Sequence, residues 1–317
     1  MRRVATDVVC SILLTAATGL CSAPTEQQVS LLSSNALQIV GLQVALAREA
    51  ISPGPIDGLV GGQTEAALKA FQQKYALRTT GVLDERTRTN LPPLAPLFTN
   101  YMVTSNDIER LLAVPVTWLG KSLAPRLDYE TVLELVAEKT LSHHKLIQAL
   151  NPSINWTNVT NGTAVTAPNA QVPAVSNKAA FVQIRLGERI LQAFGAESNL
   201  LAHFPCSIAQ RVDKRPVGEL HVAVLVVNPN YTFDPAVFPE SAEAQEIGRK
   251  LTLQPGPNNP VGTVWIGLDR PGYGIHGAPL PEKVGRTESH GCFRLANWNA
   301  EHLLKLVSVG TPVIIQP

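Results

Sequence analysis

The sequence predicts a multidomain protein with a small all-α module, a small α+β module and a larger, mainly-β C-terminal domain. Three observations predict this order. Apolar residues recur at helical spacing in the first part of the chain. Two proline-containing linkers, LPPLAP and NAQVPAVSNK, divide the sequence. Beyond the second linker, short apolar runs alternate with Gly and Pro, which is typical of strands.

The start of the chain has the composition of an export signal, predicted to span residues 1–23. Arg2 and Arg3 form a basic start, 8–20 is an apolar run, and 21–23 offers small residues for cleavage. The run is shorter than the segment a transmembrane helix needs. We therefore expect export with no stable membrane span after cleavage; a retained N-terminal anchor is the alternative.

Charge and cysteine content restrict the function classes. The 26 basic and 25 acidic residues leave no broad positive field, which argues against nucleic acid as a partner. Of the four cysteines, Cys10 and Cys21 lie in the predicted signal, so only Cys206 and Cys292 remain. Two cysteines do not form a disulfide framework. A single Cys206–Cys292 bridge stays open as the alternative to two free thiols.

The first module, 35–91, is predicted to contain three helices. Val40 and Val44 repeat at helical spacing before the turn-rich segment SPGPIDG. Phe71 and Tyr75 lie on one face of a second helix, which TTG ends. A third, short helix follows, with Asp84 as its cap.

The pattern PGPIDGLVGGQTEAALKAFQQKY, followed by TGVLDERT, resembles the peptidoglycan-binding-like domain of bacterial wall enzymes. The resemblance covers the whole first module. It implies docking to cell-wall glycopeptide, and the alternative is a plain helical spacer.

The second module, 99–168, is predicted to be α+β. YMVTSND predicts a strand and a helix cap, YETVLELVAEKTLSHHKLIQALNP predicts two helices, and NGTAVTAP predicts a closing strand. This order resembles a LysM module, a small glycan-binding fold, with an insertion at AVPVTWLGKSLAPR.

The third part, 179–317, is predicted to be a sheet-rich domain large enough for its own core. Its strand-like runs include AAFVQIRL, RILQAF, LLAHFPCSIA and ELHVAVLVV. A helix over 298–307, capped by Asn297, precedes Gly310 and a final strand, TPVIIQ.

The segments YGIHGAP and SHGC put histidines and a cysteine on glycine-rich chain. A histidine near Cys292 can accept the thiol proton, and glycines let a substrate carbonyl approach the backbone closely. Residue types and spacing leave a cysteine–histidine acyl-transfer site and a structural turn both open. A zinc site from His276, His290 and Cys292 lacks an evident fourth ligand, so we expect no metal.

The combined pattern YGIHGAP…VGRTESHGCFRL resembles the signature of the YkuD-type L,D-transpeptidase catalytic domain, over 179–317. The resemblance implies that Cys292 is the nucleophile and His276 the general base and later acid. It implies that the carbonyl of Gly277 orients the imidazole. His290, with the backbone N–H groups of Gly291 and Cys292, would hold the oxyanion. The implied substrate-binding side chains are Ser289, Arg294, Tyr273 and Trp265.

The reaction implied by this resemblance is acyl transfer on a peptidoglycan tetrapeptide stem. Cys292 would form a thioester with the third stem residue and release D-alanine. An amine of another stem would then give a 3→3 cross-link, a lysine of an envelope lipoprotein a protein–wall linkage, and water L,D-carboxypeptidase trimming. No metal or organic cofactor is needed, and carbapenems would react with the thiol. The implied location is the bacterial periplasm or cell envelope. A non-catalytic wall-anchoring protein is the alternative.

Overall fold

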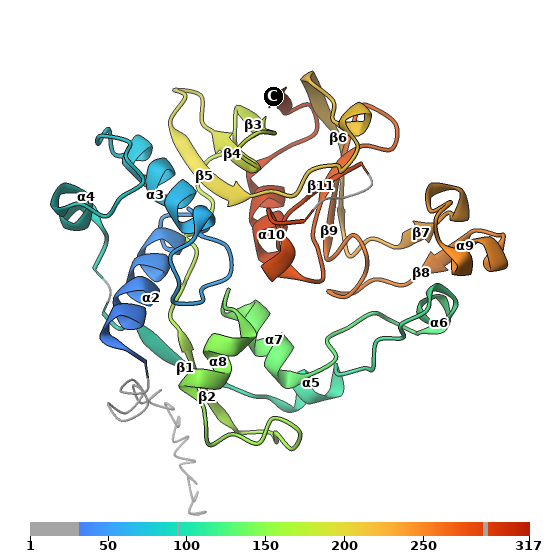
Figure 1. The fold of residues 1–317 in the computed structure, drawn as a ribbon, viewed down its shortest axis with the longest axis horizontal. Coiled ribbons are helices and arrows are strands. Elements are labelled where there is room, and N and C mark those ends of the chain that lie inside the picture. The colour runs from blue at the N-terminus through green and yellow to red at the C-terminus, as the bar shows by residue number, and fades with distance from the viewer. Residues whose placement is uncertain (1–31, 94, 288–290) are drawn as a thin grey trace, which may run out of the picture.

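The chain consists of two small modules packed against a larger C-terminal domain. The computed structural model describes residues 32–93, 95–287 and 291–317, so the predicted export signal lies outside the described residues. In Figure 1 the N-terminal helices lie beside β5, and the middle module lies below α10. None of the helices within the described ranges is long and apolar enough to cross a membrane.

The N-terminal module contains the three predicted helices, α2 (Ser34–Ala47), α3 (Gly62–Lys74) and α4 (Glu85–Asn90). Asp84 caps α4 as predicted, because its carboxylate accepts a hydrogen bond from the Thr87 N–H at 2.7 Å. Buried side chains of α2 and α3, including Leu46 and Phe71, pack against Phe194 and Leu200 of the C-terminal domain. The module is thereby fixed to one edge of the large sheet.

The middle module pairs β1 (Phe98–Met102) with β2 (Ala164–Pro168) in antiparallel orientation. The helices α7 (Val132–Lys139) and α8 (His144–Leu150) lie between these strands in sequence. This is the strand–helix–helix–strand order that was predicted, with α5 (Ser105–Glu109) and α6 (Trp118–Leu123) added. Identity with the LysM fold stays a prediction.

The C-terminal domain is built on an eight-stranded sheet with the order β11-β10-β9-β6-β12-β3-β4-β5. The bounds of these strands are β3 (Phe181–Arg185), β4 (Ile190–Phe194), β5 (Leu200–Pro205), β6 (Gly218–Val227), β9 (Val264–Leu268), β10 (Gly274–His276), β11 (Phe293–Arg294) and β12 (Pro312–Gln316). Short 3-10 turns occur at Val212–Lys214, Pro235–Val237 and Pro281–Lys283. The β10–β11 and β12–β3 pairs are parallel, and the other pairs are antiparallel.

The long strand β6 joins the two halves of this sheet. Its first residues pair with β12 and its last residues pair with β9, with a register shift between Val222 and Val224. Such a bulge bends a strand, so the sheet curls around α10 (Asn297–Leu306). Leu303 of α10 and Ile266 and Ile275 of the sheet are all buried in the shared core.

The prediction that Asn297 caps this last helix is wrong. The structure starts α10 at Asn297 itself, with Ala296 at the cap position and no side-chain capping bond. The Asn297 side chain is used elsewhere: its Nδ2 donates to Glu138, and its Oδ1 accepts the Thr263 N–H at 3.2 Å. The Asn297 side chain therefore makes long-range hydrogen bonds instead of the local capping bond that the sequence predicted.

We call residues 229–254 the lid and residues 112–126 the arm. The lid contains a two-stranded sheet, β7 (Tyr231–Phe233) and β8 (Leu251–Leu253), and the helix α9 (Ala242–Ile247). The arm extends from the middle module, and its helix α6 lies next to β8 in Figure 1. Trp118 of the arm stacks on Phe233 of the lid with ring centroids 4.4 Å apart. The lid therefore completes its apolar core with a side chain of another module.

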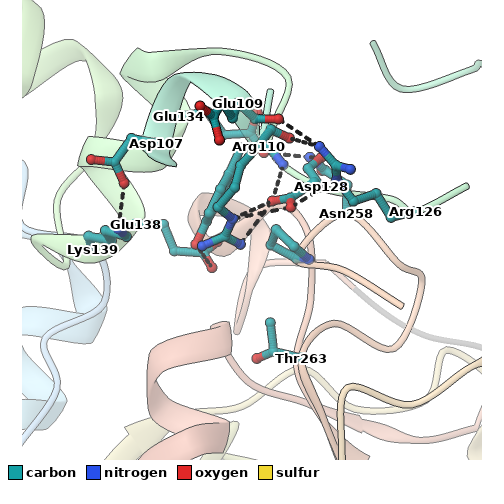
Figure 2. A network of polar contacts seen from close by, with 12 residues as sticks. Asp107, Glu109, Arg110, Arg126, Asp128, Glu134, Glu138, Lys139, Asn258 and Thr263 are labelled. Carbon is teal, nitrogen blue, oxygen red and sulfur yellow. Dashed lines mark hydrogen bonds and ion pairs between the residues drawn. The ribbon is translucent and has the colours of Figure 1, made fainter. Parts of the chain in front are cut away.

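The middle module and the C-terminal domain also contact each other through polar groups. Figure 2 shows Arg110, Arg126 and Asp128 of the middle module gathered beside Asn258 of the C-terminal domain. Asn258 Nδ2 donates to the Asp128 carbonyl at 3.0 Å, and the Leu127 N–H donates to the Pro255 carbonyl at 2.9 Å.

Glu138 of α7 is buried at this joint. Asn297 Nδ2 donates to both of its carboxyl oxygens, at 3.0 and 3.2 Å, and the Tyr129 hydroxyl donates at 3.2 Å. Burial raises the pKa of Glu138 to about 8, although these two donors favour the charged form; Glu301 and Glu134 raise it further. The carboxyl group is therefore mostly protonated at neutral pH.

Replacing Trp118 by Ala is expected to loosen the lid, because Phe233 loses its stacking partner. We expect a loss of about 2–3 kcal/mol from the unfolding free energy, since the tryptophan is half-buried. Amide hydrogen exchange across 231–253 should accelerate. Leu119→Ala, at an exposed neighbour, serves as the control and should change little. Unchanged exchange of the lid in the Trp118 variant would contradict the composite core.

The raised pKa of Glu138 predicts a specific pH dependence of stability. Between its ordinary value of 4.5 and about 8 the folded state holds a proton that the unfolded state has lost, so rising pH destabilises the fold across this window. Burial lowers the pKa values of His276 and His203, so these groups destabilise the fold as the pH falls below their ordinary value of 6.5. To separate this effect from that of Glu138, the Tm of Glu138→Gln is compared with that of the wild type at each pH.

Relative to the Gln variant, the wild-type Tm should fall from pH 5 to pH 9. The other ionisable groups around Glu138 are Glu134, Glu301, Tyr129 and, over the Tyr129 ring, Arg110. Both proteins retain these groups, so their contributions to the pH dependence of Tm largely cancel when the two proteins are compared. Glu109→Gln, at an exposed position of the same module, should keep the wild-type pH profile. A Tm difference that is constant with pH would show that Glu138 does not titrate in this range.

Candidate active site

Four cross-strand partners form a continuous row across the sheet. Val226 of β6 pairs with Trp265 of β9, Trp265 pairs with His276 of β10, and His276 pairs with Arg294 of β11. Paired residues on neighbouring strands point to the same face of a sheet. These four side chains accordingly share one face, and all four line one cavity.

Cys292 joins this face because it lies two residues before Arg294, and side chains alternate along an extended chain. The intervening Phe293 and its partner Ile275 point the other way and are buried in the core. The Cys292 S–H points to the carbonyl oxygen of Gly272, 3.6 Å from the sulfur. Strand pairing positions His276 and Arg294, and Cys292, in the bend just before β11, lines the same cavity.

The substrate cavity, as we call it, has a volume of about 760 Å³. The sheet supplies its floor, including His276 and Cys292. Tyr231 and Phe238 of the lid and Trp118 of the arm supply part of its wall. Most of the lining is apolar or aromatic, as is usual for a site that orients a ligand with few polar groups.

His276 is held by one short hydrogen bond. Its Nδ1 lies 2.6 Å from the carbonyl oxygen of Gly277, and its ring stacks on Trp265 with centroids 5.7 Å apart. A carbonyl oxygen only accepts, so Nδ1 carries the proton and Nε2 is left as the proton acceptor. Burial lowers the pKa of His276 to about 3, with a further contribution from Arg294, while the Gly277 bond acts in the opposite direction. The imidazole is neutral at physiological pH.

The thiol of Cys292 is also predominantly neutral. Its burial raises its pKa above the ordinary value, although a hydrogen bond from the Gly274 backbone and the charge of Arg294 both act to lower it. Burial thus favours the neutral form of both groups that line the cavity over a thiolate–imidazolium pair. With neutral groups, proton transfer accompanies nucleophilic attack.

Arg294 is the single cation among the described residues that line the substrate cavity, and none of them is a carboxylate. Its backbone is fixed by two hydrogen bonds with Ser207, of 2.9 and 3.0 Å. Its Nε is buried and has no hydrogen-bond partner within the described part of the chain. Buried donors without partners are uncommon, so Arg294 is a candidate contact for an anionic ligand in this cavity.

Two glycines are required where the Asn297 side chain passes behind the histidine. A Cβ on Gly277 or on Gly262 would collide with Asn297 Oδ1. Gly262 also has φ of +62°, a conformation that favours glycine. Asn297 therefore packs directly behind the carbonyl-bearing residue that orients His276.

The structure does not bring every predicted site residue to the cavity. Tyr273, predicted to wall the groove, packs against the domain core instead, with the Arg270 guanidinium 4.6 Å from its ring centroid. Ser289 and His290 lie outside the described residues. Gly291 lines the cavity beside Cys292.

The alternative of a Cys206–Cys292 disulfide is wrong, because the structure does not join these two cysteines. Cys206 is fully buried, and this burial raises its pKa strongly. Within the described ranges no cluster of His, Cys, Asp and Glu could hold a metal ion.

Sequence reasoning missed the aromatic wall formed by Trp118, Tyr231 and Phe238. Tyr231 and Phe238 belong to a long connection between two strands. Trp118 is the one tryptophan of the insertion AVPVTWLGKSLAPR, and a large aromatic residue in an otherwise exposed insertion was the available signal.

We expect iodoacetamide to alkylate Cys292 and to leave Cys206 unmodified in the folded protein. Because the pKa of Cys292 is raised, the alkylation rate should increase with pH and reach half its maximum above the ordinary thiol value. Peptide mass spectrometry across pH 6–10 measures both. Rapid alkylation of Cys292 already at pH 6 would contradict the neutral pair, and alkylation of Cys206 would contradict its burial.

Comparison with known proteins identifies two parts of the chain. Residues 179–315 match the family model YkuD, described as "L,D-transpeptidase catalytic domain". Residues 36–91 match the family described as "Putative peptidoglycan binding domain".

Individual relatives agree with the first of these matches. The "Putative L,D-transpeptidase YkuD" of Bacillus licheniformis is 26% identical over 188 residues, covering 59% of this chain and 94% of that protein. The "Putative L,D-transpeptidase YqjB" of Bacillus subtilis is 38% identical over 109 residues, covering 32% of this chain and 52% of that protein.

Among solved structures, an L,D-transpeptidase from Mycobacterium smegmatis is 20% identical, with a TM-score of 0.34, over 49% of this chain and 66% of that chain. The sequence matches carry the assignment. With its curled sheet, its cavity and these matches taken together, the chain carries a YkuD-family L,D-transpeptidase catalytic domain preceded by a peptidoglycan-binding domain.

Proposed function

We propose that this protein is a peptidoglycan L,D-transpeptidase that uses Cys292 as its nucleophile and His276 as its general base and acid. The observation that carries the proposal is the shared cavity face of these residues, with His276 Nδ1 committed to the Gly277 carbonyl. That hydrogen bond leaves Nε2 as the proton acceptor. A carbonyl takes the orienting role that a carboxylate has in many triads.

In the first half of the reaction the Cys292 sulfur attacks the carbonyl carbon of the third residue of a tetrapeptide stem. The thiol proton passes to His276 Nε2, and a tetrahedral oxyanion forms. The family resemblance assigns its stabilisation to the backbone N–H groups of Gly291 and Cys292 and to His290. The C–N bond then breaks, the departing amine of D-alanine takes the proton from His276, and a thioester remains on Cys292.

In the second half an amine acceptor attacks the thioester carbon and gives its proton to His276. The C–S bond breaks, a new amide bond forms, and the Cys292 sulfur takes the proton back. An amine of another stem gives a 3→3 cross-link, and a lysine of an envelope lipoprotein gives a protein–wall linkage. Water as the acceptor gives carboxypeptidase trimming.

The largely apolar lining of the substrate cavity supports aminolysis over hydrolysis. Its wall of Trp118, Tyr231 and Phe238 limits the access of water to a thioester on Cys292. Arg294 gives this wall one fixed positive charge, suited to a carboxylate of the stem. Transfer to an amine is therefore the preferred proposal.

The other parts of the chain support a location at the cell wall. A peptidoglycan-binding domain precedes the catalytic domain and is fixed against its sheet edge. Tethering to an insoluble polymer raises the effective concentration of stem peptides near the cavity. We propose that the protein acts in the cell envelope after export through its N-terminal signal, and that the middle module contributes to glycan binding.

Incubation with a disaccharide tetrapeptide tests the proposal. We expect mass spectrometry to show release of D-alanine and an acyl adduct on Cys292, and a cross-linked dimer on longer incubation. Cys292→Ala should abolish the adduct, whereas Cys206→Ala should form it as wild type does. Protein that binds isolated cell walls but forms no adduct would be a non-catalytic anchor. An adduct that persists in Cys292→Ala would place the nucleophile elsewhere.

A further inference from the structure

A second cavity lies across a shared wall from the substrate cavity. Trp118, Pro260 and Arg294 line both cavities. The second one, which we call the basic cavity, has a volume of about 220 Å³. The arm of the middle module forms one side, and residues 278–287 of the C-terminal domain form another.

The charged side chains among the described residues that line the basic cavity are all positive. Lys121 of the arm, Lys283 and Arg294 line it, and none of the described residues that line it is a carboxylate. Neither lysine forms an ion pair with any part of the chain that the structure describes. By contrast, Lys139 pairs with Asp107 at 2.8 Å and Lys250 pairs with Asp234 at 2.8 Å.

Lys121 occupies an unfavourable place for an unpaired charge. It is half-buried, its Nζ lies 5.3 Å from the centroid of the Trp118 ring, and burial lowers its pKa. Glu243 of the lid acts to raise that pKa, and Lys121 also lines a neighbouring cavity together with Glu130, Glu134 and Glu282. The Glu243 carboxylate accepts a hydrogen bond from the backbone N–H of Trp118, however, and does not line the basic cavity. Among the described residues that line the basic cavity, Lys121, Lys283 and Arg294 therefore have no carboxylate beside them and can bind an external anion.

We propose that the basic cavity is a carboxylate-binding subsite for the peptide substrate, with Lys121 and Lys283 as its binding residues. The inference rests on the proposed function, because stem peptides carry free carboxylates. Since the two cavities share the wall that includes Arg294, a carboxylate in the basic cavity belongs to a peptide that also reaches Cys292. Through Lys121 the middle module takes part directly in substrate selection.

Binding to the Cys292→Ala protein tests the subsite without turnover. The probes are the stem tetrapeptide and the same peptide with its side-chain carboxylates converted to carboxamides, titrated by calorimetry. Lys121→Gln and Lys283→Gln should each weaken binding of the acidic peptide about three- to tenfold. The amidated peptide should bind weakly to all variants, and added salt should reduce the difference. Lys145→Gln, at an exposed lysine of the same module that lines neither cavity, is the matched control.

Equal affinity of the acidic peptide for the parent protein and both lysine variants overturns the subsite, as does the absence of measurable binding. These outcomes are distinct from failure of the proposed function. Lysine-dependent binding without a Cys292 adduct in the wild type would retain the subsite and refute the catalysis. An adduct in the wild type together with binding that does not depend on the lysines would support the catalysis and refute the subsite. During turnover, a raised KM for the donor or for the acceptor in Lys121→Gln identifies which peptide uses the cavity.

Discussion

The parallel pairing of β10 with β11 is the constraint on which the candidate active site depends. It places His276 opposite Arg294, and the alternation of an extended chain then places Cys292 on the same face. Phe293 and Ile275 bury the opposite face in the domain core. The hydrophobic burial of these neighbours therefore helps to fix the positions of the candidate nucleophile and the candidate base.

Burial at this position sets the chemistry as well as the geometry. It disfavours both charged forms, lowering the pKa of the imidazole and raising that of the thiol. The Gly277 carbonyl fixes the tautomer, and Asn297 packs behind Gly277. Asn297 is held in turn by Glu138 of the middle module. The middle module is therefore connected to the candidate base His276 through Glu138 and Asn297, and its Trp118 forms part of the cavity wall.

The sequence predicted those features that depend on residues close together in the chain. Asp84 as a cap, the order of elements in the middle module and the final strand all follow from propensity and turn chemistry, and the structure contains them. The YkuD resemblance named Cys292 and His276 because both lie in one short stretch of the sequence, YGIHGAP…VGRTESHGCFRL. Contacts between residues far apart in the sequence have no comparable local motif from which they could be predicted. Asn297 has a side chain suited to a helix cap but hydrogen-bonds to Glu138 of the middle module. Tyr273 packs against the domain core, and Trp118 of the middle module stacks on the lid of the C-terminal domain.

A crystal structure of the protein after reaction with a carbapenem tests the central claim most directly. We predict one acyl group, bonded to Cys292 Sγ within the substrate cavity, with His276 Nε2 facing that sulfur and Nδ1 still bonded to the Gly277 carbonyl. An acyl group on another residue, or an imidazole turned so that Nδ1 faces the sulfur, would contradict the account.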